Sequence, residues 1–356
     1  MNPGYEVLNH LKTIVWLVGI KNAKAQLIQL IQNAMTDQRG EQPVSGQWPG
    51  SATQPGQARA LRPVFAEILQ QERLADSLMD LFEPLYMPMA DWLAQQHRGE
   101  PLMVGLHGGQ GSGKSTLSKM LKALLESGYD KRVVVISIDD LYLPRAARER
   151  LADQVHPLLA TRGVPGTHDL PLAMDIMQRL KQGRDFPLSI PLFDKAVDDR
   201  APLSRWQTLE QPADIILFEG WCVGAAAQSE AQLVEPINSL ERDEDPQQVW
   251  RRYVNEQLAG PYQALFAMID VLMMLKVPAM EKVFEWRLLQ ETKLKQSLAD
   301  NAQTGTHVMS EQQLNRFIMH YERITRTCLE DMPGRADVVL QLNDQHQISE
   351  VQLNGD

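Results

Sequence analysis

The residues best suited to chemistry are Lys114 and Ser115, which end a glycine-rich segment with the spacing G-x-x-x-x-G-K-S. An apolar run, Leu102–Leu106, precedes this segment, and apolar side chains recur at helical spacing from Leu117 to Leu125. Between a strand and a helix, such glycines let backbone N–H groups point at phosphate oxygens. The sequence therefore predicts a phosphate-binding loop. The residues expected to contact a nucleotide are Gly108, Gly109, Gln110, Gly111, Ser112, Gly113, Lys114, Ser115 and Thr116.

Two further apolar runs end in carboxylates that could act on the bound phosphates. Lys114 is expected to reach the β- and γ-phosphates, and Ser115 to coordinate Mg²⁺. Asp139 ends the second run, where it could accept a proton from an attacking hydroxyl or help to hold the metal. Asp140 is expected to turn away and cap the following segment, because neighbouring side chains of an extended chain point to opposite sides. Glu219 ends the third run and is expected to bind Mg²⁺ directly or through water.

The elements that must position these residues alternate between strands and helices. Alternation of this kind predicts an α/β fold of the P-loop NTPase type, with a parallel sheet of about five strands and helices on both faces. Ligands bind beyond the carboxyl ends of such strands, where the candidate residues lie. The predicted strands are 102–106, 133–138, 215–218, 271–275 and 338–342, and the predicted helices are 114–126, 170–181, 249–258 and 279–298.

The chain divides into three parts by composition. Residues 1–60 hold a short apolar run at 14–20, read as a buried strand or helix turn, and a Gly/Gln/Pro/Ser-rich linker at about 37–57. Apolar residues at helical spacing predict a helical lead-in over 61–100 that packs on the core. Residues 101–356 are expected to form the catalytic domain, with acceptor loops and a lid.

Charge and cysteine content narrow the class of protein. The 356 residues carry a formal net charge of −10, which argues against general nucleic-acid binding. The two cysteines lie far apart without metal-ligand spacing, so neither a disulfide framework nor a zinc site is expected. No apolar run is long enough to span a bilayer. We expect a soluble, cytoplasmic protein without a membrane partner, and the sequence predicts no oligomeric state.

Two polar loops and one helix supply further candidates. Segments 162–169 and 191–200 offer cations, carboxylates and backbone N–H groups that a small anionic, polyhydroxylated substrate could use, although each could be an ordinary surface loop. Arg287 lies in the helix after the fourth strand, where a lid arginine could stabilise the charge of the transferring phosphoryl group. The candidate substrate residues are Arg162, His168, Asp169, Asp194, Lys195 and Arg200.

A family resemblance accounts for these segments together. The chain resembles D-glycerate 3-kinases of the plant and fungal type, within the P-loop kinases that include uridine, pantothenate and phosphoribulo-kinases. The resemblance runs from about Leu102 to the last residue and rests on GGQGSGKST, SIDDLYL, RGVPGTHDL, PLFDKAVDDR, ILFEGWCVG, EPINSLERDED and EWRLLQE.

This resemblance implies ATP- and Mg²⁺-dependent phosphorylation of the 3-hydroxyl of D-glycerate. It implies that Asp139 is the catalytic aspartate and that Arg287 belongs to the lid. It also implies that Arg162, His168, Asp169 and Lys195 lie in or near the acceptor pocket. The family often has tyrosine before Asp194, where this chain has Phe193.

Other functions stay open at this point. A nucleoside, pantothenate or a sugar phosphate could be the acceptor instead of glycerate. A nucleotide-dependent switch or assembly factor is a further alternative, but no N-K-x-D motif follows the fourth strand, where 276–278 reads K-V-P, and no L-S-G-G-Q signature occurs. An inactive binding protein on the same fold would not need the full set of Lys114, Ser115, Asp139 and Glu219.

Overall fold

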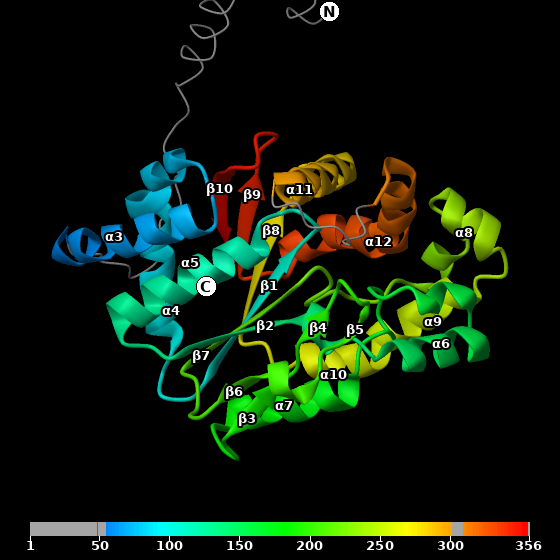
Figure 1. Ribbon diagram of the computed structural model, residues 1–356, viewed down its shortest axis with the longest axis horizontal. Helices are drawn as coiled ribbons and strands as arrows, with labels where there is room; N and C mark the ends of the chain where they lie inside the picture. Colours follow the sequence, from blue (N-terminus) through cyan, green and yellow to red (C-terminus); the bar gives the residue numbers. More distant parts are fainter. Residues whose placement is uncertain (1–47, 49–54, 301–308, 355–356) are drawn as a thin grey trace, which may run out of the picture. The chain divides into compact units, whose positions relative to one another are not determined.

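A mostly parallel sheet forms the centre of the molecule (Figure 1). The computed structural model describes residues 48, 55–300 and 309–354. The sheet has six strands in the order β10-β9-β8-β1-β7-β2, and only β10 runs antiparallel to its neighbour. The five predicted strands are confirmed, and β10 is an addition. The strands are β1 (Leu102–Gly108), β2 (Val133–Ser137), β7 (Ile215–Gly220), β8 (Val271–Lys276), β9 (Val338–Leu342) and β10 (Ile348–Leu353).

Helices cover both faces of the sheet, as predicted. Alternate side chains of β1 point to opposite faces, so that Val104 belongs to one apolar cluster and Met103 to the other. Figure 1 shows α3, α4 and α5 on one side and α7, α9 and α10 on the other. The helices are α3 (Pro55–Gln71), α4 (Met87–Gln96), α5 (Lys114–Tyr129), α6 (Arg145–Gln154), α7 (Leu170–Gln182), α8 (Ser239–Glu244), α9 (Val249–Gln257), α10 (Gln263–Phe266), α11 (Met280–Asp300) and α12 (Glu311–Asp331).

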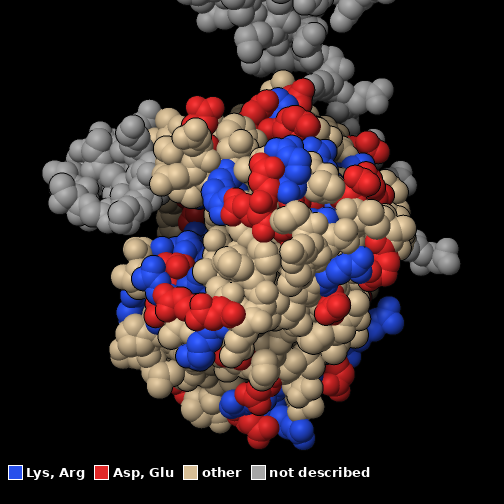
Figure 2. All heavy atoms as spheres, turned by 90° about the vertical axis from the view of Figure 1, so that its right-hand side faces the viewer, with Lys and Arg blue, Asp and Glu red and all other residues tan. Residues whose placement is uncertain are grey.

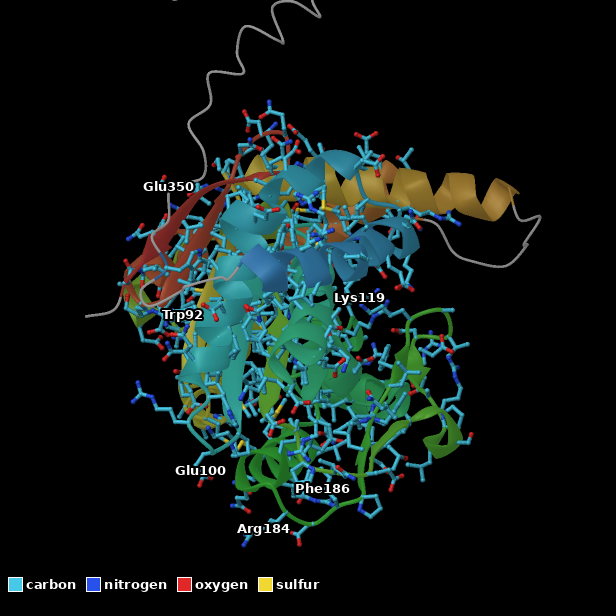
Figure 3. All side chains as sticks on the ribbon, turned by 90° about the vertical axis from the view of Figure 1, so that its left-hand side faces the viewer. Trp92, Glu100, Lys119, Arg184, Phe186 and Glu350 are labelled. Atoms are coloured by element: carbon cyan, nitrogen blue, oxygen red, sulfur yellow. The ribbon has the colours of Figure 1, made fainter. Side chains whose placement is uncertain are left out.

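The helical lead-in packs against α5 through apolar and charged contacts. The ring of Phe65 on α3 lies 5.1 Å from that of Phe82, between α3 and α4. Lys119 on α5 forms a 2.7 Å ion pair with Glu72, and Figure 3 shows Lys119 and Trp92 on this face. Helix α3 begins at Pro55, earlier than the predicted start near residue 61. The prediction began too late because the proline and glycine at the first two positions of the helix are also typical of a linker. The run at 14–20 and most of the predicted linker lie outside the described residues.

Two small antiparallel pairs of strands form sheets of their own. Strands β3 (Leu188–Ile190) and β6 (Gln207–Leu209) pair with each other, and so do β4 (Phe193–Asp194) and β5 (Asp199–Arg200). Figure 3 shows Glu100, just before β1, at the same end of the molecule as Arg184 and Phe186. That end holds the start of β1, so the carboxyl ends of the parallel strands face the opposite end.

The surface mixes charges of both signs. On the face shown in Figure 2, Lys and Arg lie among Asp and Glu. Paired charges of this kind include Arg316 on α12 and Glu244 on α8. Within the described residues, no helix is long and apolar enough to cross a membrane.

Candidate active site

The loop between β1 and α5 has the geometry of a phosphate-binding loop. Gly111 and Gly113 have φ angles of +81° and +93°, a left-handed backbone that favours glycine. The polar side-chain atoms of Gln110 and the hydroxyl of Ser112 are buried without a hydrogen-bond partner among the described residues. Buried polar groups normally find partners, so these orphaned atoms fit a loop that closes around a ligand. Lys114 begins α5, and Thr116 is half-buried in its first turn.

Glu219 and Ser115 meet at the carboxyl end of β7. In the sheet, Glu219 pairs with Leu106 on one side and with Ser137 on the other, so it lies between β1 and β2. Ser115 Oγ donates a 3.1 Å hydrogen bond to Glu219 Oε1, while Glu219 Oε2 is buried without a partner among the described residues. A free carboxylate oxygen beside a hydroxyl fits Mg²⁺, which takes few protein ligands and keeps phosphate oxygens and waters. The described residues include no cluster of three or more His, Cys, Asp or Glu able to hold a metal.

Asp139 is held at the end of β2 by two partners. Tyr142 Oη donates a 2.8 Å hydrogen bond to Asp139 Oδ1, and Lys195 Nζ lies 2.6 Å from Oδ2. Burial would raise the pKa of Asp139, but Lys195, Lys114 and the hydrogen bonds hold that pKa well below its usual range. Asp139 is therefore a carboxylate that can orient a hydroxyl and accept hydrogen bonds.

Asp140 turns away from Asp139, as predicted, but its partner differs from the expected one. Its Oδ1 accepts a 3.1 Å hydrogen bond from the backbone N–H of Phe193 in β4. The predicted capping role was wrong, because the helix that follows, α6, has Pro144 at its N-cap position and no side-chain cap. Asp140 thus ties the hairpin that carries Lys195 to the end of β2.

A buried arginine that sequence reasoning missed holds the acceptor loops together. Arg148 on α6 is 1% exposed and donates 2.7 Å hydrogen bonds to the carbonyl oxygens of Ala160 and Asp198. Asp198 also pairs with Arg162. The guanidinium groups of Arg148 and Arg162 lie 5.7 and 5.5 Å from the ring centre of Phe193. The buried ring of Phe193 therefore packs against two cations. This contact does not need the hydroxyl of the tyrosine that the family often has at this position.

Four of the predicted substrate residues do not line the cleft. His168 is buried behind Tyr142, with the two rings stacked 4.5 Å apart, and its Nδ1 lies 2.5 Å from the hydroxyl of Tyr262. Asp169 caps α7 and pairs with Arg200, and Asp194 pairs with the exposed Arg205. The cleft lining includes none of these four residues, so the expected direct contact with substrate is corrected: their contacts within the chain position the acceptor loops. They are His168, Asp169, Asp194 and Arg200.

Burial sets the charge of the stacked histidine. It lowers the pKa of His168 to about 3, so the ring is neutral at physiological pH. A neutral imidazole can share a proton with the Tyr262 hydroxyl and still stack on Tyr142. The neutral His168 ring therefore packs on Tyr142, the hydrogen-bond partner of Asp139, and adds no charge there.

Helix α11 brings Arg287 against the phosphate-binding loop. A Cβ atom at Gly111 would lie 3.1 Å from Cβ of Trp286 and 3.4 Å from the backbone nitrogen of Arg287. The close approach explains why this loop position needs glycine. Arg287 pairs with Glu291 at 2.5 Å, and both residues face the cleft. The Trp286 ring stacks on His346, in the β9–β10 turn, with 4.1 Å between centres.

These groups surround one cleft of about 920 Å³. Of the predicted site residues, the cleft brings together nine from the phosphate loop, the strand ends, the acceptor loops and α11. Sequence reasoning missed several others that face it, among them Tyr321 of α12, whose hydroxyl donates to the carbonyl of Arg162. The nine are Gln110, Gly111, Lys114, Ser115, Asp139, Arg162, Lys195, Glu219 and the predicted lid residue Arg287.

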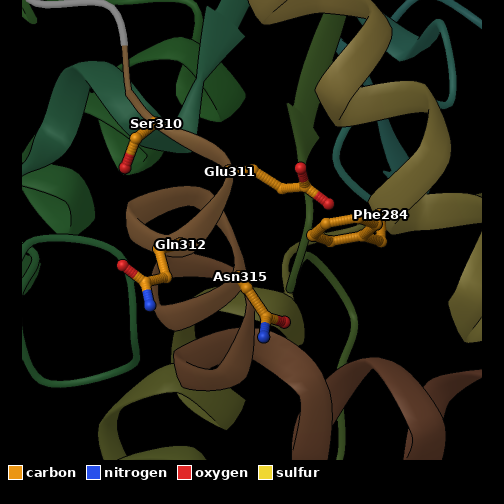
Figure 4. Close-up of a pocket in the computed structure, with 5 residues that line it drawn as sticks. All are labelled: Phe284, Ser310, Glu311, Gln312 and Asn315. Carbon is orange, nitrogen blue, oxygen red and sulfur yellow. The ribbon is translucent and has the colours of Figure 1, made fainter.

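A second hollow, of about 630 Å³, lies between α11 and the start of α12. Figure 4 shows Glu311 pointing toward the Phe284 ring, with Gln312 and Asn315 nearby. Its described lining residues include no lysine or arginine. Ser310 already caps α12 with its side chain.

The fold and this cleft define a P-loop kinase. A family model described as the KAP family P-loop domain matches residues 82–180. The chain is 33% identical over 231 residues to the uncharacterized kinase mug58 of Schizosaccharomyces pombe, with 63% of this chain and 79% of that protein covered. It is 30% identical over 257 residues to the chloroplastic D-glycerate 3-kinase of Arabidopsis thaliana, covering 66% of this chain and 52% of that protein.

A solved structure shares the fold. The D-glycerate 3-kinase from Cryptococcus neoformans matches with a TM-score of 0.62 and 26% identity, covering 75% of this chain and 99% of that one. The chain therefore belongs to the D-glycerate 3-kinase-like family of P-loop kinases. It is a phosphotransferase with a nucleotide-binding loop of the P-loop type.

Proposed function

We propose that this kinase transfers the γ-phosphoryl group of ATP to the 3-hydroxyl of D-glycerate. The observation that carries the proposal is the composition of the cleft lining. Two cations, Arg162 and Lys195, lie there beside Asp139. A small acceptor with a carboxylate at one end and a hydroxyl at the other matches this arrangement of charges. The names of the related D-glycerate 3-kinases support the same acceptor.

The proposed roles follow from position. Residues 108–116 would wrap the phosphates, Lys114 and Arg287 would neutralise charge on the transferring group, and Asp139 would orient the acceptor hydroxyl. Ser115 and Glu219 would hold Mg²⁺, which would neutralise negative charge on the phosphates. We assign Asp139 to the hydroxyl in preference to the metal, because its two oxygens contact Tyr142 and Lys195 and not the Ser115–Glu219 pair.

Arg162 and Lys195 are the proposed ligands of the acceptor carboxylate. Each is now paired with a carboxylate of the chain itself, Asp198 and Asp139 respectively. These pairs show that the wall can accommodate a carboxylate at hydrogen-bond distance. The cytoplasmic location, the division into three parts and the absence of a nucleic-acid partner stay predictions from the sequence.

A coupled assay of ADP release tests the proposal. Purified protein with ATP and Mg²⁺ should turn over D-glycerate faster than L-glycerate, a nucleoside or pantothenate. Lys114→Ala serves as the control for contaminating kinases. Turnover of another acceptor without turnover of D-glycerate would replace the substrate and keep the kinase. ATP hydrolysis that depends only on a macromolecule would instead favour the nucleotide-dependent switch.

A further inference from the structure

Both carboxylate oxygens of Asp139 are occupied in this structure. Oδ1 accepts the hydrogen bond from Tyr142, and Oδ2 pairs with Lys195. An acceptor hydroxyl must reach one of these oxygens before it can be oriented for attack. Each oxygen can accept more than one hydrogen bond, but its present partner competes with the hydroxyl, so the hydroxyl gains best access to the oxygen whose partner can move away.

Tyr142 is the fixed partner. It is 2% exposed, its ring stacks on His168 at 4.5 Å, and the edge of Phe193 packs on it at 5.2 Å. Displacing Tyr142 would break this stack and leave a buried hydroxyl without its acceptor. Its hydrogen bond to Asp139 is expected to persist when substrate binds.

Lys195 is the mobile partner. Its side chain is 56% exposed, and it lies directly after β4, in the turn toward β5. Val197, in the same turn, is also exposed. A lysine is a point charge on a flexible four-carbon stem, so it can exchange one carboxylate for another at small cost. Arg162 is less free, because it pairs with Asp198 and stacks on Phe193.

We propose that the Lys195–Asp139 ion pair blocks the catalytic carboxylate until the carboxylate of an acceptor draws Lys195 away. This inference rests on the proposed function, since it assigns the acceptor's anionic group a second role besides binding. Lys195 then discriminates among acceptors: an anionic acceptor frees Asp139, whereas a neutral one of the same shape leaves the ion pair closed.

The transfer that follows is balanced in atoms and charge. The freed Asp139 accepts a hydrogen bond from the acceptor hydroxyl, whose oxygen forms a bond to the γ-phosphorus. The bond between that phosphorus and the β–γ bridging oxygen breaks, and the electron pair leaves with ADP. The hydroxyl proton passes to Asp139 and then to solvent. With water as the acceptor, the same steps produce ADP, inorganic phosphate and a proton.

Two acceptor analogues separate the gating role from simple binding. Glycerol has the hydroxyls of glycerate but no carboxylate. D-Lactate keeps the carboxylate and lacks the 3-hydroxyl. In the wild-type protein, D-lactate should raise ATP hydrolysis several-fold, because it draws Lys195 from Asp139 without offering the hydroxyl. Glycerol should neither raise hydrolysis nor be phosphorylated at a comparable rate.

The Lys195→Ala variant provides the decisive measurement. If the ion pair blocks Asp139, this variant should show ATP hydrolysis and glycerol phosphorylation raised by several-fold, and D-lactate should add nothing. If Lys195 only binds the carboxylate, KM for D-glycerate will rise while hydrolysis and glycerol turnover stay at the wild-type level. That second result overturns the inference.

Two further variants act as controls. Lys195→Arg keeps a cation beside Asp139, so its ATP hydrolysis without acceptor should stay below that of Lys195→Ala. Arg205→Ala removes an exposed cation that pairs with Asp194 outside the cleft lining, and it should behave as the wild type. Failure of the proposed function would appear as no turnover of D-glycerate by the wild-type protein. If only this inference fails, the wild-type protein will turn over D-glycerate, but Lys195→Ala will phosphorylate glycerol no faster than the wild type.

Discussion

Ser115 Oγ donates a hydrogen bond of 3.1 Å to Glu219 Oε1, and this contact links the phosphate-binding loop to the end of the neighbouring strand β7. The other oxygen of Glu219 is buried and has no partner among the described residues. A buried carboxylate oxygen without a partner is costly, and a bound cation or its water would compensate it. The two residues therefore form the most suitable place for Mg²⁺ in the cleft.

Glu219→Gln should lower the affinity of the enzyme for Mg²⁺. The amide keeps the shape and can still accept from Ser115, but it loses the negative charge that attracts the cation. The Mg²⁺ concentration for half-maximal turnover should rise about 10- to 100-fold, the range found when support of a metal site is lost. A Mg²⁺ titration at saturating ATP measures this, and an unchanged midpoint would place the metal elsewhere.

Lys114→Ala tests the phosphate-binding loop. Removal of a charge-stabilising donor from the transferring group should lower kcat at least about 10²-fold. Thermal unfolding of the variant should resemble that of the wild type, since Lys114 faces the cleft. Turnover near the wild-type rate would contradict the proposed role of the loop.

Asp139→Asn tests the assignment of the catalytic carboxylate. The amide has nearly the same size but cannot accept a proton, so transfer to the acceptor should be lost while ATP still binds. Equilibrium binding of ATP and ADP release are the two measurements. Loss of ATP binding together with turnover would instead indicate that Asp139 supports the metal or the loop.

Tyr142→Phe separates orientation of Asp139 from its charge. The ring stack on His168 remains, and only the 2.8 Å hydrogen bond to Asp139 is removed. Hydrogen bonds to charged groups contribute about 1.5–3 kcal/mol, so kcat should fall roughly 10- to 100-fold. KM for ATP should stay the same. A change confined to stability, with normal kcat, would show that the tyrosine has only a packing role.

The sequence predicted the parts of the site that depend on local patterns. Lys114 and Glu219 follow apolar strands, and strand ends in a parallel sheet meet at one edge. Arg148 and Tyr321 were missed because no helix was predicted at α6 or α12, and a local pattern does not show which distant loop a side chain reaches. His168 was misplaced for the converse reason: its polar loop looked accessible, but tertiary packing buries it behind Tyr142. Strand β10 escaped prediction because its edge position leaves only part of it buried.

Stability should depend on pH through the buried histidines. Burial lowers the pKa of His168 to about 3 and that of His320 to about 4, whereas the unfolded chain titrates near 6.5. The unfolded state therefore binds protons first as the pH falls. Each neutral histidine contributes fully to the free energy of unfolding above about pH 6.5. This contribution is lost as the pH falls toward the pKa of the histidine in the folded state. Each residue should reduce the free energy of unfolding by about 1.4 kcal/mol per pH unit within that window.

His168→Phe measures one of these contributions. The aromatic ring can keep the stack on Tyr142, but the variant has no group to protonate, and it loses the contact with the Tyr262 hydroxyl. It should be less stable than the wild type at pH 7, and its free energy of unfolding should fall less steeply between pH 6.5 and 4.5. Urea unfolding at several pH values gives both slopes. His320→Phe should flatten the slope in the same way, and equal slopes in all three proteins would mean that His168 and His320 are protonated in the folded state.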